Sequence, residues 1–85
     1  MRVEWSVRSI KDMRRLSPGN RELVIAQVEQ YAEDPASLVN QVIALANSNH
    51  RRLRVGNYRV IFSVESGTVA IMLVLRVRHR RESYD

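Results

Sequence analysis

Residues 52–62 read Arg52-Leu53-Arg54-Val55-Gly56-Asn57-Tyr58-Arg59-Val60-Ile61-Phe62, with largely alternating apolar and polar side chains on both sides of one glycine. Alternation with a period of two is typical of strands that bury one face. Glycine followed by asparagine favours a type II′ hairpin turn with the glycine in first place. We therefore expect an antiparallel hairpin in which Arg54 lies opposite Arg59 and Arg52 lies opposite Ile61.

A second turn signal, Ser66-Gly67, predicts a third strand beside the hairpin, with Phe62 opposite Ile71 and Val60 opposite Leu73. In this register one face of the sheet is apolar throughout, and a slip of one residue would scramble both faces. The apolar face carries Leu53, Val55, Tyr58, Val60, Phe62, Val64, Val69, Ile71, Leu73, Leu75 and Val77. The other face carries at one end Arg52, Arg54, Arg59, Arg76 and Arg78.

The first half of the chain predicts a strand and two helices. Residues 1–5 alternate as a short strand would, and Val7, Ile10 and Met13 recur at helical spacing until turn residues interrupt them at 17–20. A helix is expected over residues 21–33, closed by Pro35, because one apolar stripe runs along it. The stripe consists of Val24, Ile25, Val28, Tyr31 and Ala32. Residues 36–46 lack a clean stripe and predict a short helix or a loop.

These elements predict one α+β domain over residues 1–85. We expect an N-terminal strand, a helical hairpin and a three-stranded antiparallel meander, with the helices packed on one face of the sheet. The absence of cysteine excludes disulfides, and no run approaches the roughly 20 apolar residues of a membrane span. The start, Met1 to Trp5, lacks the apolar run of a signal peptide, so a cytoplasmic location with no membrane partner is expected.

Positive charge is concentrated in the second half of the chain. Fourteen basic and nine acidic residues give a net charge of +5, and residues 51–85 supply that whole excess through arginine alone. Arginine binds phosphate bidentately and stays charged when crowded. The pattern favours binding of a polyanion. The alternatives are a plain solvated face and a surface that binds an acidic protein.

The run 52–62 and the later run Leu75-Arg76-Val77-Arg78-His79-Arg80-Arg81-Glu82-Ser83-Tyr84 together resemble the RelE/ParE toxin family of bacterial toxin–antitoxin systems. For RelE-like members, the resemblance implies an endoribonuclease that cuts messenger RNA in the ribosomal decoding site and is held inactive by an antitoxin. Position by position, it implies catalytic roles for Arg59, His79, Arg80 or Arg81, and Tyr84. It matches Arg52 and Arg54 to the basic pair before the hairpin, and we add Arg76 and Arg78 as phosphate-binding residues.

The chemistry of RNA cleavage suits these residue types. The 2′-hydroxyl must lose a proton, the phosphorane must be stabilised, and the leaving 5′-oxygen must gain a proton. Clustered arginines stabilise developing negative charge, and their field should lower the pKa of Tyr84 towards that of a usable base. His79 could act as acid or base, or stack on a nucleobase, so the choice of general base between His79 and Tyr84 stays open. Tyr58 is assigned to the core.

Two histidines and no cysteine predict no metal site, and no glycine-rich phosphate loop or Ser/His/Asp signature predicts another cofactor. The leading hypothesis is thus a metal-independent, ribosome-dependent endoribonuclease that inhibits translation. The alternatives are a ParE-like inhibitor of DNA gyrase with the same fold, and a non-catalytic basic module that binds RNA or an antitoxin. A toxin should form a hetero-oligomer with an acidic, partly disordered antitoxin segment, and this binding should be salt-sensitive.

Overall fold

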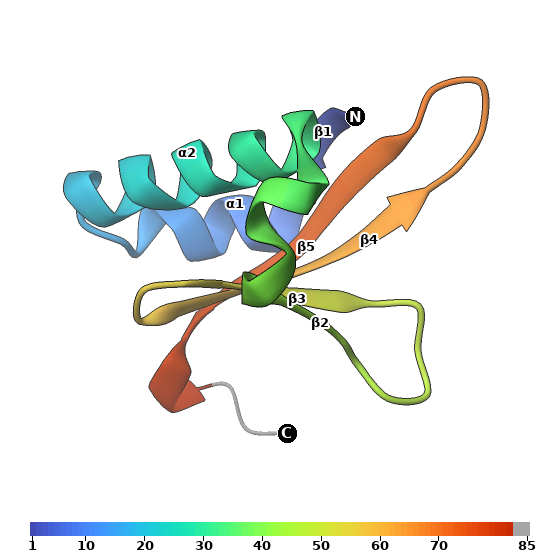
Figure 1. Cartoon of the computed structure of the whole chain (residues 1–85). Coiled ribbons are helices and arrows are strands. Elements are labelled where there is room, and N and C mark those ends of the chain that lie inside the picture. Colours follow the sequence, from blue (N-terminus) through green and yellow to red (C-terminus); the bar gives the residue numbers. More distant parts are fainter. Residues whose placement is uncertain (83–85) are drawn as a thin grey trace.

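The computed structural model describes residues 1–82 (Figure 1). Its helices are α1 (Val7–Arg14), α2 (Pro18–Glu33) and two 3₁₀ helices, η1 (Pro35–Gln41) and η2 (Arg80–Glu82). Its strands are β1 (Arg2–Trp5), β2 (Val42–Ala44), β3 (Arg51–Val55), β4 (Tyr58–Glu65) and β5 (Ile71–His79). None of the helices in this part of the chain is long and apolar enough to cross a membrane.

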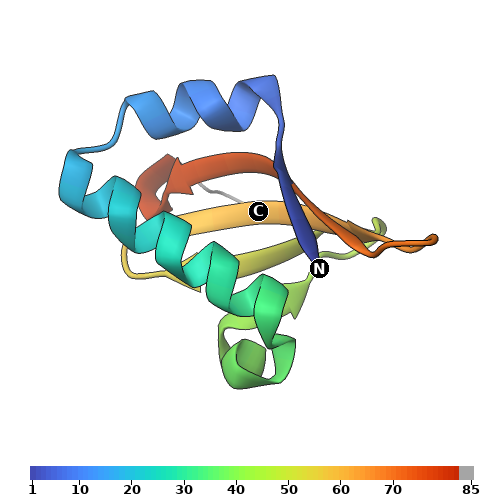
Figure 2. The ribbon, with the colours of Figure 1, turned by 90° about the horizontal axis from the view of Figure 1, so that it is seen from above.

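The five strands form one sheet in the order β1-β5-β4-β3-β2, in which β1 runs parallel to β5 and the other pairs are antiparallel. Helix α2 lies over one face of this sheet, whereas α1 runs along the β5 edge (Figure 2). The predicted α+β fold is confirmed, with one strand more than expected. Strand β2, in the segment predicted as a short helix or loop, has three residues, too few to show a period in the sequence.

Serine side chains start both α-helices. The Ser6 Oγ accepts a hydrogen bond from the Ser9 N–H (3.1 Å), and the Ser17 Oγ accepts one from the Asn20 N–H (3.3 Å). Pro18 occupies the first turn of α2, where its missing N–H costs nothing. The run 17–20, predicted as a turn, therefore caps and begins α2.

The apolar spacing of α1 predicted its buried face only in part, because Met13 is buried as expected but Val7 and Ile10 are not. Val7 and Ile10 are 70% and 43% exposed, and beside Met13 the helix buries the polar residues Ser9 and Asp12. The reason is that α1 covers the edge of β5, which presents backbone N–H and C=O groups that need polar partners.

The hairpin between β3 and β4 has the predicted register, with Arg54 opposite Arg59 and Arg52 opposite Ile61. Gly56 has a φ of 58°, as the first position of a type II′ turn requires. This local prediction is confirmed.

The predicted register between β4 and β5 is wrong. The connection spans residues 66–70 instead of two residues, so Phe62 pairs with Val74 rather than Ile71. A bulge between Ile61 and Phe62 leaves Leu75 as the extra residue of β5 and brings Arg76 opposite Ile61. The core face of β5 consequently carries Met72, Val74 and Val77, not Val69, Ile71, Leu73 and Leu75.

The core lies between α2 and the sheet. From α2 it takes Val24, Val28 and Tyr31, and the Tyr31 ring meets the Phe62 ring edge to face at 5.0 Å between centroids. The sheet contributes Leu53, Val55, Val60, Phe62, Met72, Val74 and Val77. This packing leaves the opposite face of β3, β4 and β5 uncovered by a helix.

Candidate nucleic-acid interface

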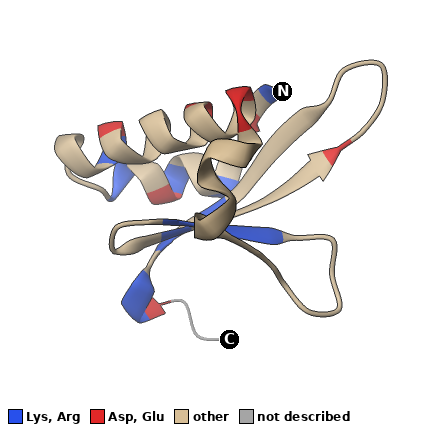
Figure 3. Ribbon diagram, in the orientation of Figure 1, with Lys and Arg blue, Asp and Glu red and all other residues tan. Residues whose placement is uncertain are grey.

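Three arginines lie side by side across the uncovered face. Arg54 on β3 pairs with Arg59 on β4, which pairs with Arg78 on β5. We call these three residues the arginine row. They share a face because residues directly opposite in a sheet project to the same side, and basic residues gather on these strands (Figure 3).

Arg59 lies at the centre of the row. Burial, followed by the positive charges of Arg52, Arg54 and Arg80, lowers the pKa of the Arg59 guanidinium from its ordinary value. Its Nη1 donates to the backbone carbonyl oxygens of Gly56 and Tyr58, both at 3.1 Å. These four arginines, Arg52, Arg54, Arg59 and Arg80, form what we call the basic cluster together with Arg78, which lies opposite Arg59 on β5. Arg59 is thus held in place inside an excess of positive charge.

No member of the basic cluster forms an ion pair within residues 1–82, although the charge of Arg78 acts on Asp12. The ion pairs in this part of the chain join Arg2 to Glu4 and Arg76 to Asp12. Like charges opposite one another destabilise a sheet. An anion that binds across the cluster would relieve this repulsion, because its charges would lie opposite several guanidiniums at once.

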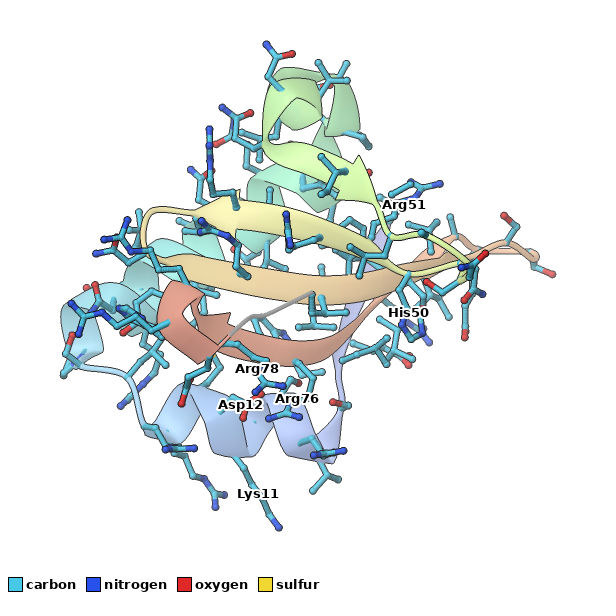
Figure 4. The ribbon with its side chains drawn as sticks, turned by 90° about the horizontal axis from the view of Figure 1, so that it is seen from below. Lys11, Asp12, His50, Arg51, Arg76 and Arg78 are labelled. Carbon is cyan, nitrogen blue, oxygen red and sulfur yellow. The ribbon has the colours of Figure 1, made fainter. Side chains whose placement is uncertain are left out.

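Arg76 is not available for such binding. Its Nε and Nη2 donate to the two carboxylate oxygens of Asp12 at 2.8 and 3.3 Å, and the Val77 N–H donates to the same carboxylate at 2.9 Å. Figure 4 shows Asp12 reaching Arg76 from α1 while Lys11 points away from the sheet. The predicted phosphate-binding role of Arg76 is therefore replaced by a structural one, the attachment of α1 to β5.

The charge state of Asp12 follows from these contacts. Burial alone would raise its pKa, but the hydrogen bonds from Arg76 and the Val77 N–H, with the charges of Arg76 and Arg78, lower the pKa below its ordinary value. The bond to Asp12 in turn raises the pKa of Arg76. Both partners are ionised at neutral pH. Sequence reasoning missed Asp12, although a lone acidic residue between Glu4 and Glu22 was a usable signal.

The predicted catalytic residues lie on both sides of the sheet near the end of β5, with Arg59 on the uncovered face and His79 on the other. His79 lies opposite Tyr58, on the helix-covered side of the sheet, and the two rings meet edge to face at 5.4 Å. The Arg81 N–H donates to His79 Nδ1 at 3.1 Å, which fixes the imidazole orientation. The Arg80 N–H donates to the Asn57 carbonyl oxygen at 2.7 Å, which holds Arg80 beside the hairpin turn that precedes Arg59. Tyr84 lies outside the described residues.

An open cavity of about 430 Å³ lies between α1, the end of β5 and η2. Arg81 and His79 line it together with Arg15 and Leu16 from the α1 end, two residues that sequence reasoning did not single out. Arg78 lines this cavity as well as belonging to the arginine row. It thereby connects the two halves of the candidate site.

The fold is that of toxins from toxin–antitoxin pairs. The structure matches the YoeB/ParE toxin from Agrobacterium tumefaciens with a TM-score of 0.76 and 18% identity, covering 93% of this chain and 98% of that one. It matches a chain of the archaeal RelE-RelB complex from Pyrococcus horikoshii with a TM-score of 0.77 and 22% identity, covering 96% and 97%. The RelBE2 toxin-antitoxin complex from Mycobacterium tuberculosis gives a TM-score of 0.67 and 20% identity, covering 93% and 96%. No curated protein matches the chain.

The sequence assigns the family. Residues 3–84 match the family model described as the ParE toxin of the type II toxin-antitoxin system parDE. The chain therefore belongs to the ParE toxin family, and the predicted resemblance to RelE/ParE toxins is confirmed.

Proposed function

We propose that this type II toxin is a metal-independent endoribonuclease that cleaves messenger RNA on the ribosome in the cytoplasm and so inhibits translation. The observation that carries the proposal is the basic cluster, with Arg59 anchored by two carbonyl oxygens at its centre. An RNA backbone supplies the evenly spaced negative charges that such a cluster binds. Within residues 1–82 no acidic side chain pairs with the cluster, so RNA would not have to displace one.

The arginines have defined tasks in 2′-hydroxyl attack. Arg59 and Arg80 stabilise the phosphorane, whose charge exceeds that of the ground state, while Arg52, Arg54 and Arg78 hold neighbouring phosphates. The leaving 5′-oxygen must also gain a proton, and His79 is the sequence-based candidate to supply it as general acid. Its ring contacts Tyr58 on the helix-covered side of the sheet, so the RNA would have to pass around the end of β5 to meet both His79 and Arg59. Tyr84 remains the sequence-based candidate for the base.

Dependence on the ribosome fits this small set of groups. A site rich in arginine but poor in acids and bases gains most from a substrate whose reacting atoms are already aligned. The ribosome orients messenger RNA in this manner, which lowers the entropic cost that the toxin alone would have to meet.

The proposed partner is an antitoxin. The similar archaeal and mycobacterial structures are complexes with antitoxins, and this chain presents an uncovered basic face. An acidic, partly disordered segment would cover the basic cluster in a hetero-oligomer, and its binding would weaken as salt screens the charges.

Inhibition of DNA gyrase is the second candidate. It is favoured by the match of nearly the whole chain to the ParE family model. In that case the basic cluster binds without catalysis, and substitution of His79 or Tyr84 leaves toxicity unchanged.

Primer extension on a reporter messenger RNA after brief induction separates the two candidates. We expect discrete in-frame cuts with the wild type and with Arg8→Ala, a control at an exposed arginine of α1. The cuts should vanish in Arg59→Ala and Tyr84→Phe. Growth arrest without cuts, together with loss of supercoiling by purified gyrase, would reject the ribonuclease and support the second candidate.

A further inference from the structure

The cavity beside α1 combines an apolar wall with positive charge. Leu16 and Val77 are buried core residues, the Tyr58 ring packs against that core, and Arg15 and Arg81 bring guanidiniums to the same cavity. We propose that it binds a nucleotide, with the base against Tyr58 and Leu16 and the phosphate on Arg15 and Arg81. The inference rests on the proposed function, because it names a second subsite for the same RNA strand.

The cavity has the size and character that a nucleotide requires. Small-molecule sites typically span about 300–1,000 Å³ and combine apolar walls with a few polar groups, and this one measures about 430 Å³. The edge-to-face contact of His79 with Tyr58 leaves ring surfaces beside the cavity, on which a base can stack.

The two proposed phosphate ligands are available. Neither Arg15 nor Arg81 forms an ion pair within residues 1–82. Of the two carboxylates that line the cavity, Asp12 is occupied by Arg76 and the Val77 N–H, and Glu82 accepts the His79 N–H at 3.3 Å. The charge of Asp12 is thereby balanced by that of Arg76, so Glu82 is the carboxylate of the cavity from which a bound phosphate has to keep its distance.

Arg21 removes a second obstacle to anion binding. The C-terminal end of a helix exposes carbonyl oxygens that repel anions. The Arg21 guanidinium donates to the carbonyl oxygens of Met13 (3.1 Å) and Leu16 (2.9 Å) and so satisfies this end of α1. Arg15, the C-cap residue, is left free to bind a ligand.

Arg78 indicates the path that a bound RNA strand would follow. It belongs to the arginine row and also lines the cavity. One RNA strand can therefore place the reacting phosphate at Arg59 and turn the flanking base around the end of β5 into the cavity. Bases unstacked in this way are the usual mode of single-stranded RNA recognition.

The test is a titration of the purified toxin with adenosine 3′-monophosphate, followed by NMR. We expect shifts at the Tyr58 and His79 rings, and affinity about tenfold lower in Arg15→Ala, since one charge-assisted hydrogen bond is lost. Arg14→Ala is the matched control, because Arg14 is the neighbouring exposed arginine outside the cavity. It should change affinity less than about twofold, because an exposed charge that does not line the cavity is screened by solvent.

Three results would overturn the inference. These are equal affinity for inorganic phosphate and the nucleotide, equal losses in Arg14→Ala and Arg15→Ala, and loss of nucleotide binding in Arg59→Ala. The results that would reject the proposed function differ from these three. Nucleotide binding in a toxin that makes no messenger RNA cuts would retain the cavity and reject the ribonuclease, whereas cuts without nucleotide binding would reject the cavity alone.

Discussion

The backbone N–H of Val77 donates a hydrogen bond of 2.9 Å to the carboxylate of Asp12, at a point where β5 has no neighbouring strand on that side. Strand β1 pairs with β5 only as far as Val74. Beyond it, the Ser6 Oγ donates to the Leu75 carbonyl oxygen at 2.9 Å and Asp12 takes the next free N–H. Helix α1 therefore protects an edge that would otherwise be open to pairing with another chain.

Removal of the Asp12 carboxylate should destabilise the fold strongly. Asp12→Ala leaves the Val77 N–H and the partly buried Arg76 without partners, and we expect a loss of about 2 kcal/mol in the free energy of unfolding. Urea denaturation at neutral pH measures it. Glu4→Ala is the control, because the Glu4 pair with Arg2 is exposed and should contribute less than about 1 kcal/mol. Similar losses in both variants would contradict this account.

The same carboxylate should make stability depend on pH. Because folding lowers the pKa of Asp12 below its ordinary value, the stabilisation is complete above that ordinary value and is lost as pH falls through the folded pKa. We expect the wild type to have a higher free energy of unfolding than Asp12→Asn. This difference should be constant near neutral pH and shrink in acid. A difference that grows as pH falls would show the opposite sign of the shift.

The two hairpins show what the sequence could and could not predict. The register of β3 and β4 follows from Gly56-Asn57, a turn that fixes its own geometry. The register of β4 and β5 depends on the loop 66–70 and on a bulge at Leu75, and neither has a local signature. The alternation around the turn therefore predicted the pair Arg54 and Arg59 correctly. The predicted register that placed Ile71 opposite Phe62 could not bring Arg78 opposite Arg59, so the third member of the arginine row was missed.

The contact between Asp12 and Arg76 could not be predicted from neighbouring residues in the sequence. Asp12 meets Arg76 across most of the chain, and no periodicity in α1 indicates that this helix covers a strand edge instead of a sheet face. For the same reason the cavity residues Arg15 and Leu16 were missed. Their roles depend on where α1 lies relative to β5, which only the assembled sheet defines.

Replacement of Gly56 by alanine should destabilise the fold, whereas replacement of Gly67 should not. Its φ of 58° is strained for any residue with a side chain, while an added Cβ would lie 4.0 Å from Leu23, which is ordinary contact. We expect Gly56→Ala to cost about 1 kcal/mol of unfolding free energy through backbone conformation. Gly67→Ala, in open space without a positive φ, should change stability by less than about 0.5 kcal/mol in thermal or urea unfolding. Equal costs would refute the turn assignment.

The arginine row should lower stability in the free toxin. Arg54→Gln removes one of two like charges that face each other, and we expect the free energy of unfolding to rise by about 0.5 kcal/mol at low salt. High salt should reduce the gain, because it screens the repulsion. Arg8→Gln, an exposed position on α1, provides the comparison. No gain at low salt would mean that the row is not electrostatically strained.

RNA binding should release a number of counterions set by the basic cluster. For a 2′-O-methylated single strand that cannot be cleaved, five phosphate contacts predict a slope of about −3.5 in a plot of log K against log salt. Arg59→Ala should reduce the magnitude of the slope by about 0.7, and Arg8→Ala should leave it unchanged. Fluorescence anisotropy at several salt concentrations measures both. A slope near zero in the wild type would exclude the basic cluster as the phosphate-binding surface, because neutralised phosphates must release their counterions.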